Sequence, residues 1–203
     1  MKKYAVLHEP GDIVTLAGTR FVVLDVDRRG SLPDSLFLLA LESVGVSEFG
    51  SSNNYAESDL KKAVDKWLED MDKRGLDNAK LIPREIDLTT LDGSGCYGKL
   101  SVKAAPLTLD EAREYADIIP NAERWCWLAT GWSGPSKSGG GLALYVNYNG
   151  DLDGYGCSNS KGIRPALKAS SILFEDSEAG LDLSKIPTDD LLQEIHRRLA
   201  EKA

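Results

Sequence analysis

The sequence predicts an α+β domain, and three observations carry that prediction. The first fifty residues contain three apolar runs separated by short turns, which is typical of paired strands. Two later segments place apolar side chains at helical spacing. From residue 123 onward, short runs with strand character alternate with loops rich in glycine, serine and asparagine.

The N-terminal strands are expected to form a β-meander. Residues 12–16 and 20–26 flank a turn at residues 17–19 that contains glycine, which is a hairpin signal. A third apolar run follows at residues 35–41. Because this run is apolar without alternation, we expect it to be buried on both faces.

The first helix is predicted from a single apolar stripe. Asn54 with Glu57 three residues later resembles a capping box, and Gly75 supplies a stop signal. The spacing of the stripe is that of one helix face. Its members are Leu60, Val64, Trp67, Leu68 and Met71.

The second helix is predicted to begin after Thr108, because Glu111 completes the pattern Thr-x-x-Glu. It is expected to stop before Pro120, which cannot continue a helix. The stretch between the two helices, residues 81–105, gives no clear pattern beyond glycines that mark turns.

Residues 123–167 are predicted to form small strands. Trp125 and Trp127 would face the same side of a strand, where core packing is the usual role of tryptophan. Asn149 and Gly150 form a strong hairpin signal. The strands expected here cover residues 142–147, 152–155 and 163–167.

The C-terminal segment differs in composition from the rest, so the chain is divided into a domain of residues 1–174 and a tail of residues 175–203. The tail has eight acidic and four basic residues, giving a charge of −4 out of −8 for the chain. Its amphipathic helix either packs on its own domain or contacts a partner or a second copy. The apolar stripe consists of Leu191, Leu192, Ile195 and Leu199.

Composition removes several classes of function. An acidic chain with a pI near 4.9 is a poor match for nucleic-acid phosphates. No apolar run of membrane-spanning length and no signal peptide is found, so we expect a cytoplasmic or virion location. Three cysteines and two histidines indicate reduced thiols and argue against a zinc site.

A calcium loop is the one metal motif that the sequence approaches. Residues 149–154 match the start of Asp-x-Asx-x-Asx-Gly, but the first position is Asn149. The twelfth position is Ser160 rather than the bidentate glutamate. A polar hairpin is therefore expected here, and neither a metal nor another cofactor is predicted.

An ordered series of motifs resembles a bacterial and phage domain family of unknown function. The series begins with Ser-Asn-Asn-Tyr and the helix after it, and ends with Gly-Ile-Arg-Pro-Ala-Leu. The match extends over roughly residues 10–170. Its segments are residues 49–60, 67–68, 107–112, 125–129, 145–150 and 162–167.

The resemblance implies a C-type-lectin-like fold, in the branch shared with formylglycine-generating enzymes and the variable proteins of diversity-generating retroelements. It further implies two helices, a small twisted sheet and a ligand face near the C-terminal motif. The sequence departs from the family at Ala129, where arginine is usual. It also lacks the paired reactive cysteines of the sulfatase-modifying oxidases, which disfavours formylglycine formation.

The sequence and the resemblance together predict a non-enzymatic domain, encoded by a phage or prophage, that binds a protein or glycan through residues 132–160. This segment is rich in residues that dominate paratopes, as a retroelement-diversified variable protein would be. No nucleic-acid or membrane partner is expected, and the C-terminal helix is a candidate for homo-oligomer contacts. The predicted contacts are Trp132, Tyr145, Asn147, Tyr148, Asn149, Asp151, Asp153, Tyr155 and Asn159.

Two alternatives remain open. A metal- and thiol-dependent enzyme of the formylglycine-generating branch would use Cys126 or Cys157, which requires an exposed thiol of low pKa. A structural subunit of a virion would use the tail helix for assembly.

Overall fold

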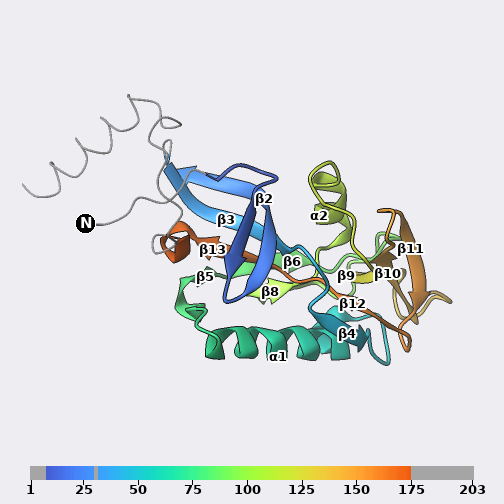
Figure 1. Ribbon diagram of the computed structural model, residues 1–203. Helices are drawn as coiled ribbons and strands as arrows, with labels where there is room; N and C mark the ends of the chain where they lie inside the picture. Colours follow the sequence, from blue (N-terminus) through green and yellow to red (C-terminus); the bar gives the residue numbers. More distant parts are fainter. Residues whose placement is uncertain (1–7, 30–31, 175–203) are drawn as a thin grey trace, which may run out of the picture.

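The computed structural model describes residues 8–29 and 32–174, and it has an α+β architecture. Figure 1 shows the two larger sheets side by side, with α1 running beneath both and α2 on the opposite side. The helices are α1 (Asp59–Lys73) and α2 (Leu109–Glu114), with short 3-10 turns η1 (Tyr55–Glu57), η2 (Asn78–Lys80) and η3 (Ser171–Phe174).

The first sheet, sheet A, has the strand order β1-β2-β3-β13-β5, and β8 also pairs with β13. Its strands are β1 (Ile13–Leu16), β2 (Thr19–Arg29), β3 (Leu32–Ala40), β5 (Leu81–Ile82), β8 (Ala104–Ala105) and β13 (Ala166–Ser170). The second sheet, sheet B, has the order β11-β10-β9-β12-β4. Its strands are β4 (Gly45–Glu48), β9 (Cys126–Gly131), β10 (Leu142–Val146), β11 (Leu152–Gly156) and β12 (Ser160–Ile163).

The predicted β-meander is confirmed as β1, β2 and β3. Ala17 (φ 44°) and Gly18 (φ 77°) both lie in the left-handed region, which is the geometry of the two-residue hairpin turn favoured between twisted strands. Leu36, Leu38 and Leu39 on β3 are all buried, as the unbroken apolar run predicts. Strands β6 (Arg84–Asp87) and β7 (Lys99–Val102) form a separate ribbon inside the stretch that gave no pattern.

The first helix begins later than its sequence signal. Asn54 caps the 3-10 turn η1, while the side chain of Ser58 accepts a hydrogen bond from the backbone N–H of Lys61 and caps α1. The chain therefore makes one tight turn before the α-helix starts. The predicted stop is confirmed, because Gly75 adopts φ +102° directly after the helix.

The second helix is shorter than expected. Its capping box is confirmed, with Thr108 and Glu111 each bonding the other's backbone. The regular helix ends at Glu114, because the backbone N–H groups of Ile118 and Ile119 both bond the carbonyl of Tyr115 in a tighter turn. This turn packs Ile118 and Ile119 against the apolar cluster between α2 and the sheets.

Two antiparallel chain pairs join the sheets. In sheet A, β3 pairs with β13, and in sheet B their continuations β4 and β12 pair with each other. The chain passes between sheets at Arg164 and Pro165, so the expected strand over residues 163–167 is divided into the end of β12 and the start of β13. The closing motif therefore lies at the junction of the two sheets.

The described part of the chain has no helix long and apolar enough to cross a membrane. The predicted tail, residues 175–203, and its proposed helix lie outside the described residues.

Candidate functional site

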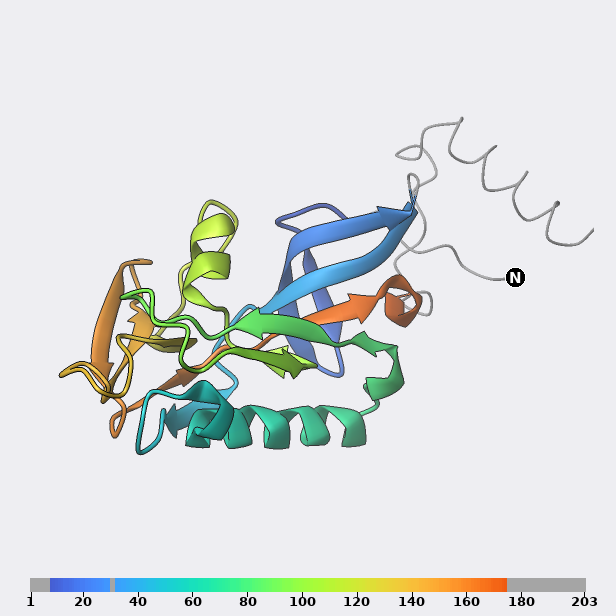
Figure 2. The same cartoon turned by 180° about the vertical axis from the view of Figure 1, so that it is seen from behind.

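One face of sheet B carries a cluster of aromatic rings, which we call the aromatic face and define by Trp125, Trp127, Tyr145, Tyr155 and Lys161. Tyr145 lies opposite Trp127 on one side and opposite Asp153 on the other, so these side chains share a face of the sheet. The opposite, aliphatic face carries the intervening residues. Figure 2 shows this sheet from behind, at the end of the molecule away from sheet A.

Lys161 is surrounded by these rings. Its Nζ lies 4.0 Å from the ring centroid of Tyr155 and 4.1 Å from that of Tyr145. The indole rings of Trp125 and Trp127 lie 4.6 Å and 5.2 Å away. All four distances are within the range of cation–π attraction, because the negative ring faces attract an ammonium within about 6 Å.

The rings also order one another. Trp125 stacks on Tyr145 with centroids 5.0 Å apart, whereas Tyr155 meets Tyr145 edge to face at 6.2 Å. Trp127 is buried and its Nε1 donates a hydrogen bond to the backbone carbonyl of Ser47 on β4. The cluster is therefore fixed from below by Trp127, and it is open above, where Trp125 and Tyr155 are 38% and 43% exposed.

The electrostatics leave Lys161 with unused donors. Burial lowers the pKa of this ammonium, while the charge of Asp153 opposes that shift. Within the part of the chain that the structure describes, Nζ has ring contacts but neither a hydrogen bond nor an ion pair. Tyr145 donates instead to Asp153, across 3.4 Å. Lys161 itself is only 6% exposed, so its unused donors lie next to the exposed rings of Trp125 and Tyr155 and not on the open surface.

The loop that precedes β10 is held in place by Asn53. The Asn53 amide donates to the backbone carbonyls of Ser133 and Leu142, at 2.9 Å and 3.0 Å, and its oxygen accepts from Tyr97 at 2.6 Å. Gly131 leaves the space for this side chain, since an added Cβ would lie 2.8 Å from its amide nitrogen. One buried amide thus sets the entry to the β10–β11 hairpin.

The predicted contact residues divide into three groups. Tyr145, Asp153 and Tyr155 meet on the aromatic face, although Tyr145 is buried and only 5% exposed. Trp132 packs on the other side of β11, where an added Cβ on Gly154 would lie 2.2 Å from its ring. The remaining residues lie in turns that border β11: Asn147, Tyr148, Asn149 and Asp151 before it, and Asn159 after it.

The strand expected over residues 142–147 ends at Val146, which changes how its polar residues act. Asn147 folds back over the hairpin turn and accepts hydrogen bonds from the N–H groups of Asn149 and Asp151. Gly150 adopts φ +89°, in the left-handed region, as the predicted Asn149-Gly150 turn requires. Asn147 and Asn149 therefore shape the turn rather than project beside Tyr145.

Sequence reasoning did not select Lys161 and gave Trp125 only a secondary place. The spacing of Trp125 and Trp127 signalled a shared face, and the structure has Lys161 over both rings. Lys161 reaches them because β12 pairs parallel with β9, through Gly162 and Cys126. Nothing local in the sequence around Lys161 marks that long-range pairing.

Cys126 and Cys157, the two cysteines of the enzyme alternative, are buried thiols. Burial raises the pKa of both Cys126 and Cys157 to about 11, so each is a neutral thiol near neutral pH. Cys96 is exposed. Over the described ranges, no group of three or more potential ligands is placed to hold a metal ion.

Comparison of the chain with protein-family models, with curated proteins and with solved structures gave no match in any of the three. The aromatic face is therefore the ground on which a function is argued, since function follows from a site and not from a fold class.

Proposed function

We propose that the chain is a non-enzymatic ligand-binding protein that recognises a glycan or a protein through the aromatic face. The observation that carries the proposal is the Lys161 ammonium, held between the exposed rings of Trp125 and Tyr155 without a hydrogen-bond acceptor in the described residues. Binding sites combine apolar and aromatic walls with a few placed polar groups, and this surface has both.

The same surface favours a glycan. Flat aromatic rings stack on the apolar face of a sugar ring, and the ammonium of Lys161 and the carboxylate of Asp153 offer a donor and an acceptor for hydroxyl groups. The resemblance to C-type-lectin-like domains agrees with this proposal. The α+β architecture, with two helices and small, mainly antiparallel sheets, supports the proposal.

A glycan array probed with the full chain tests the proposal. We expect Trp125→Ala and Tyr155→Ala each to weaken binding about tenfold or more, which corresponds to roughly 1.4 kcal/mol. Val46→Ala is the matched control, because Val46 is 58% exposed on the same sheet but outside the aromatic face.

If Trp125→Ala and Tyr155→Ala both bind glycans as the unaltered chain does, the assignment of the binding site to the aromatic face is wrong. If no glycan binds, the glycan assignment is wrong. A photo-crosslinking amino acid at position 155 then tests the protein alternative, and absence of crosslinks dependent on Trp125 would overturn that as well.

A further inference from the structure

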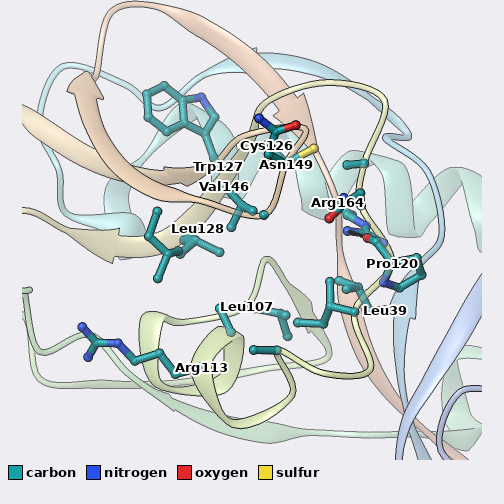
Figure 3. Close-up of a pocket in the computed structure, with 17 residues that line it drawn as sticks. Leu39, Leu107, Arg113, Pro120, Cys126, Trp127, Leu128, Val146, Asn149 and Arg164 are labelled. Carbon is teal, nitrogen blue, oxygen red and sulfur yellow. Dashed lines mark hydrogen bonds between the residues drawn. The ribbon is translucent and has the colours of Figure 1, made fainter.

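A pocket of about 290 Å³ lies between the aliphatic face of sheet B and α2 with the turn that follows it. Figure 3 shows Leu107, Leu128 and Val146 around it, with Arg164 beside Pro120 on one side and Arg113 on the other. The volume is at the lower end of the range for small-molecule sites and leaves no room for a folded partner segment.

The charged residues that line this Arg164 pocket are both cations. Arg113 is mostly exposed and its nearest carboxylate is Asp110, 3.9 Å away and outside the lining. Arg164 is only 6% exposed. Among the described residues, no aspartate or glutamate contributes to the walls. The pocket therefore combines apolar walls with positive charge.

Arg164 is a buried guanidinium without a counter-ion in residues 8–29 and 32–174. Its Nε donates to the carbonyl of Ala40 at 2.7 Å, and its Nη1 donates to the carbonyl of Pro120 at 2.9 Å. The remaining nitrogen, Nη2, is buried with no hydrogen-bond partner. A buried charge with an unused donor costs free energy, which a bound anion would offset.

We propose that the Arg164 pocket binds a small carboxylate with an apolar body, of the chemical class of a medium-chain fatty acid. The carboxylate accepts a hydrogen bond from Nη2 of Arg164, and the hydrocarbon packs against Leu107, Leu128 and Val146. Nη2 is covered in the structure, so the side chain of Arg164 or one that covers it must rotate before the carboxylate can reach this nitrogen. The charge-assisted bond fixes the orientation, and burial of the hydrocarbon supplies the attraction.

Calorimetric titration of the full chain with octanoate, and with octanol as the matched neutral ligand, tests the chemistry. We expect octanoate to bind at least about tenfold more tightly than octanol, because a carboxylate accepts a charge-assisted hydrogen bond from Arg164, whereas a hydroxyl oxygen accepts only a weaker, neutral one. Equal affinity for the two would overturn the carboxylate assignment. Absence of octanoate binding would overturn the proposal entirely.

A blocking substitution tests the location. Ala116 is exposed and lines the pocket, so Ala116→Phe should weaken octanoate binding about tenfold or more without disturbing the core. Asp117→Phe, in the same turn but outside the lining, is the control and should bind as the unaltered chain does. Unchanged binding by Ala116→Phe would contradict the assigned site.

Two further measurements test the contact with Arg164 and distinguish this pocket from the aromatic face. The NMR signal of the Arg164 Nε–H group should shift on addition of octanoate, and it should shift less on addition of octanol, which has no charge. Trp125→Ala should leave octanoate binding unchanged, because Trp125 lies on the aromatic face and outside the pocket. A static Arg164 signal during octanoate binding would overturn the contact with the guanidinium.

Discussion

The two faces of sheet B each bury a cation, and they hold it by different means. On the aromatic face, Lys161 is surrounded by ring faces. On the aliphatic face, Arg164 is held by two backbone carbonyls. The residue types suit these environments, because an ammonium is a compact point charge whereas a guanidinium presents several donors in a fixed plane.

The difference predicts what each cation does for the fold. The rings remain packed on one another when the lysine is removed, since Trp125 and Trp127 each contact Tyr145 directly. The carbonyls of Ala40 and Pro120 have no such alternative and would lose their donor. Arg164 is therefore a structural tie between β3, β12 and the turn after α2, while Lys161 is freer to serve a ligand.

The largest expected effect tests this contrast directly. Arg164→Met should lower the free energy of unfolding by roughly 2–4 kcal/mol, because the carbonyls of Ala40 and Pro120 both lose their donor, a loss that removal of the buried charge offsets in part. Lys161→Met should lose about 2 kcal/mol or less, since the lost cation–π attraction is partly balanced by removal of a buried charge. Urea unfolding of both variants measures the difference. Equal losses would show that the two cations have the same role.

Gly154 on β11 provides the next test, because it lies between Asp153 and Tyr155 of the aromatic face and is itself in contact with Trp132 on the opposite face. An added Cβ on Gly154 would lie 2.2 Å from the ring of Trp132, so Gly154→Ala should destabilise the chain by about 1–3 kcal/mol. Gly156→Ala is the matched control, since its added Cβ meets only the end of the Asn159 side chain, at 3.0 Å. Melting temperatures of both variants make the comparison, and a similar loss in both would refute the packing of Trp132.

Local signals were enough to predict much of the fold. The meander, the capping box of Thr108 and Glu111, and the Asn149-Gly150 hairpin each depend on residues close in sequence, and all three are confirmed. The start of α1 was misplaced because Asn54 and Ser58 both carry capping side chains. Local chemistry does not decide which of two competing caps starts the α-helix.

The candidate site could be predicted only in part. Tyr145, Asp153 and Tyr155 were selected from the hairpin composition, and they do meet on one face. Lys161 and Arg164 could not be found in that way, because their surroundings come from strands and turns far apart in sequence. Arg164, for example, bonds a carbonyl 124 residues away. Pairing between distant strands sets these contacts.

The buried thiols give a third, pH-dependent comparison, since Cys126 lines the Arg164 pocket and Cys157 lies in the core beneath the aromatic face. Both have a pKa raised to about 11 by burial, against about 8.5 in an unfolded chain. The folded state keeps its protons longer, so stability should fall as pH rises from about 8.5 towards about 11. At about pH 9 each thiol should contribute a loss of about 1 kcal/mol or less.

Thiol labelling of the folded chain provides the readout. Cys96 should react first because it is exposed, and Cys126 and Cys157 should react only when the chain unfolds. Rapid labelling of Cys126 alone would mean that the aliphatic face opens to solvent. Replacing Cys126 or Cys157 by alanine should flatten the decline of stability with pH.

The last expected effect concerns the hairpin turn that connects β10 and β11. Asn147 accepts hydrogen bonds from the N–H groups of Asn149 and Asp151, and its amide donates to the Asp151 carboxylate at 3.0 Å. Asn147→Ala should cost about 0.5–1.5 kcal/mol, because these bonds are largely exposed to water. Tyr148→Ala, at a residue 55% exposed in the same turn, is the control and should change stability by less than about 0.5 kcal/mol.

The same variant tests whether the faces act independently. Asn149, Gly150 and Leu152 line the Arg164 pocket, so a loosened turn should weaken octanoate binding. Tyr155 should keep its place, because its register with Ala143 lies at the other end of the hairpin and does not involve the turn. Asn147→Ala should therefore reduce octanoate affinity while ligand binding on the aromatic face is unchanged. Loss of both activities together would show that the turn couples the two faces, and that sheet B presents one binding unit instead of two.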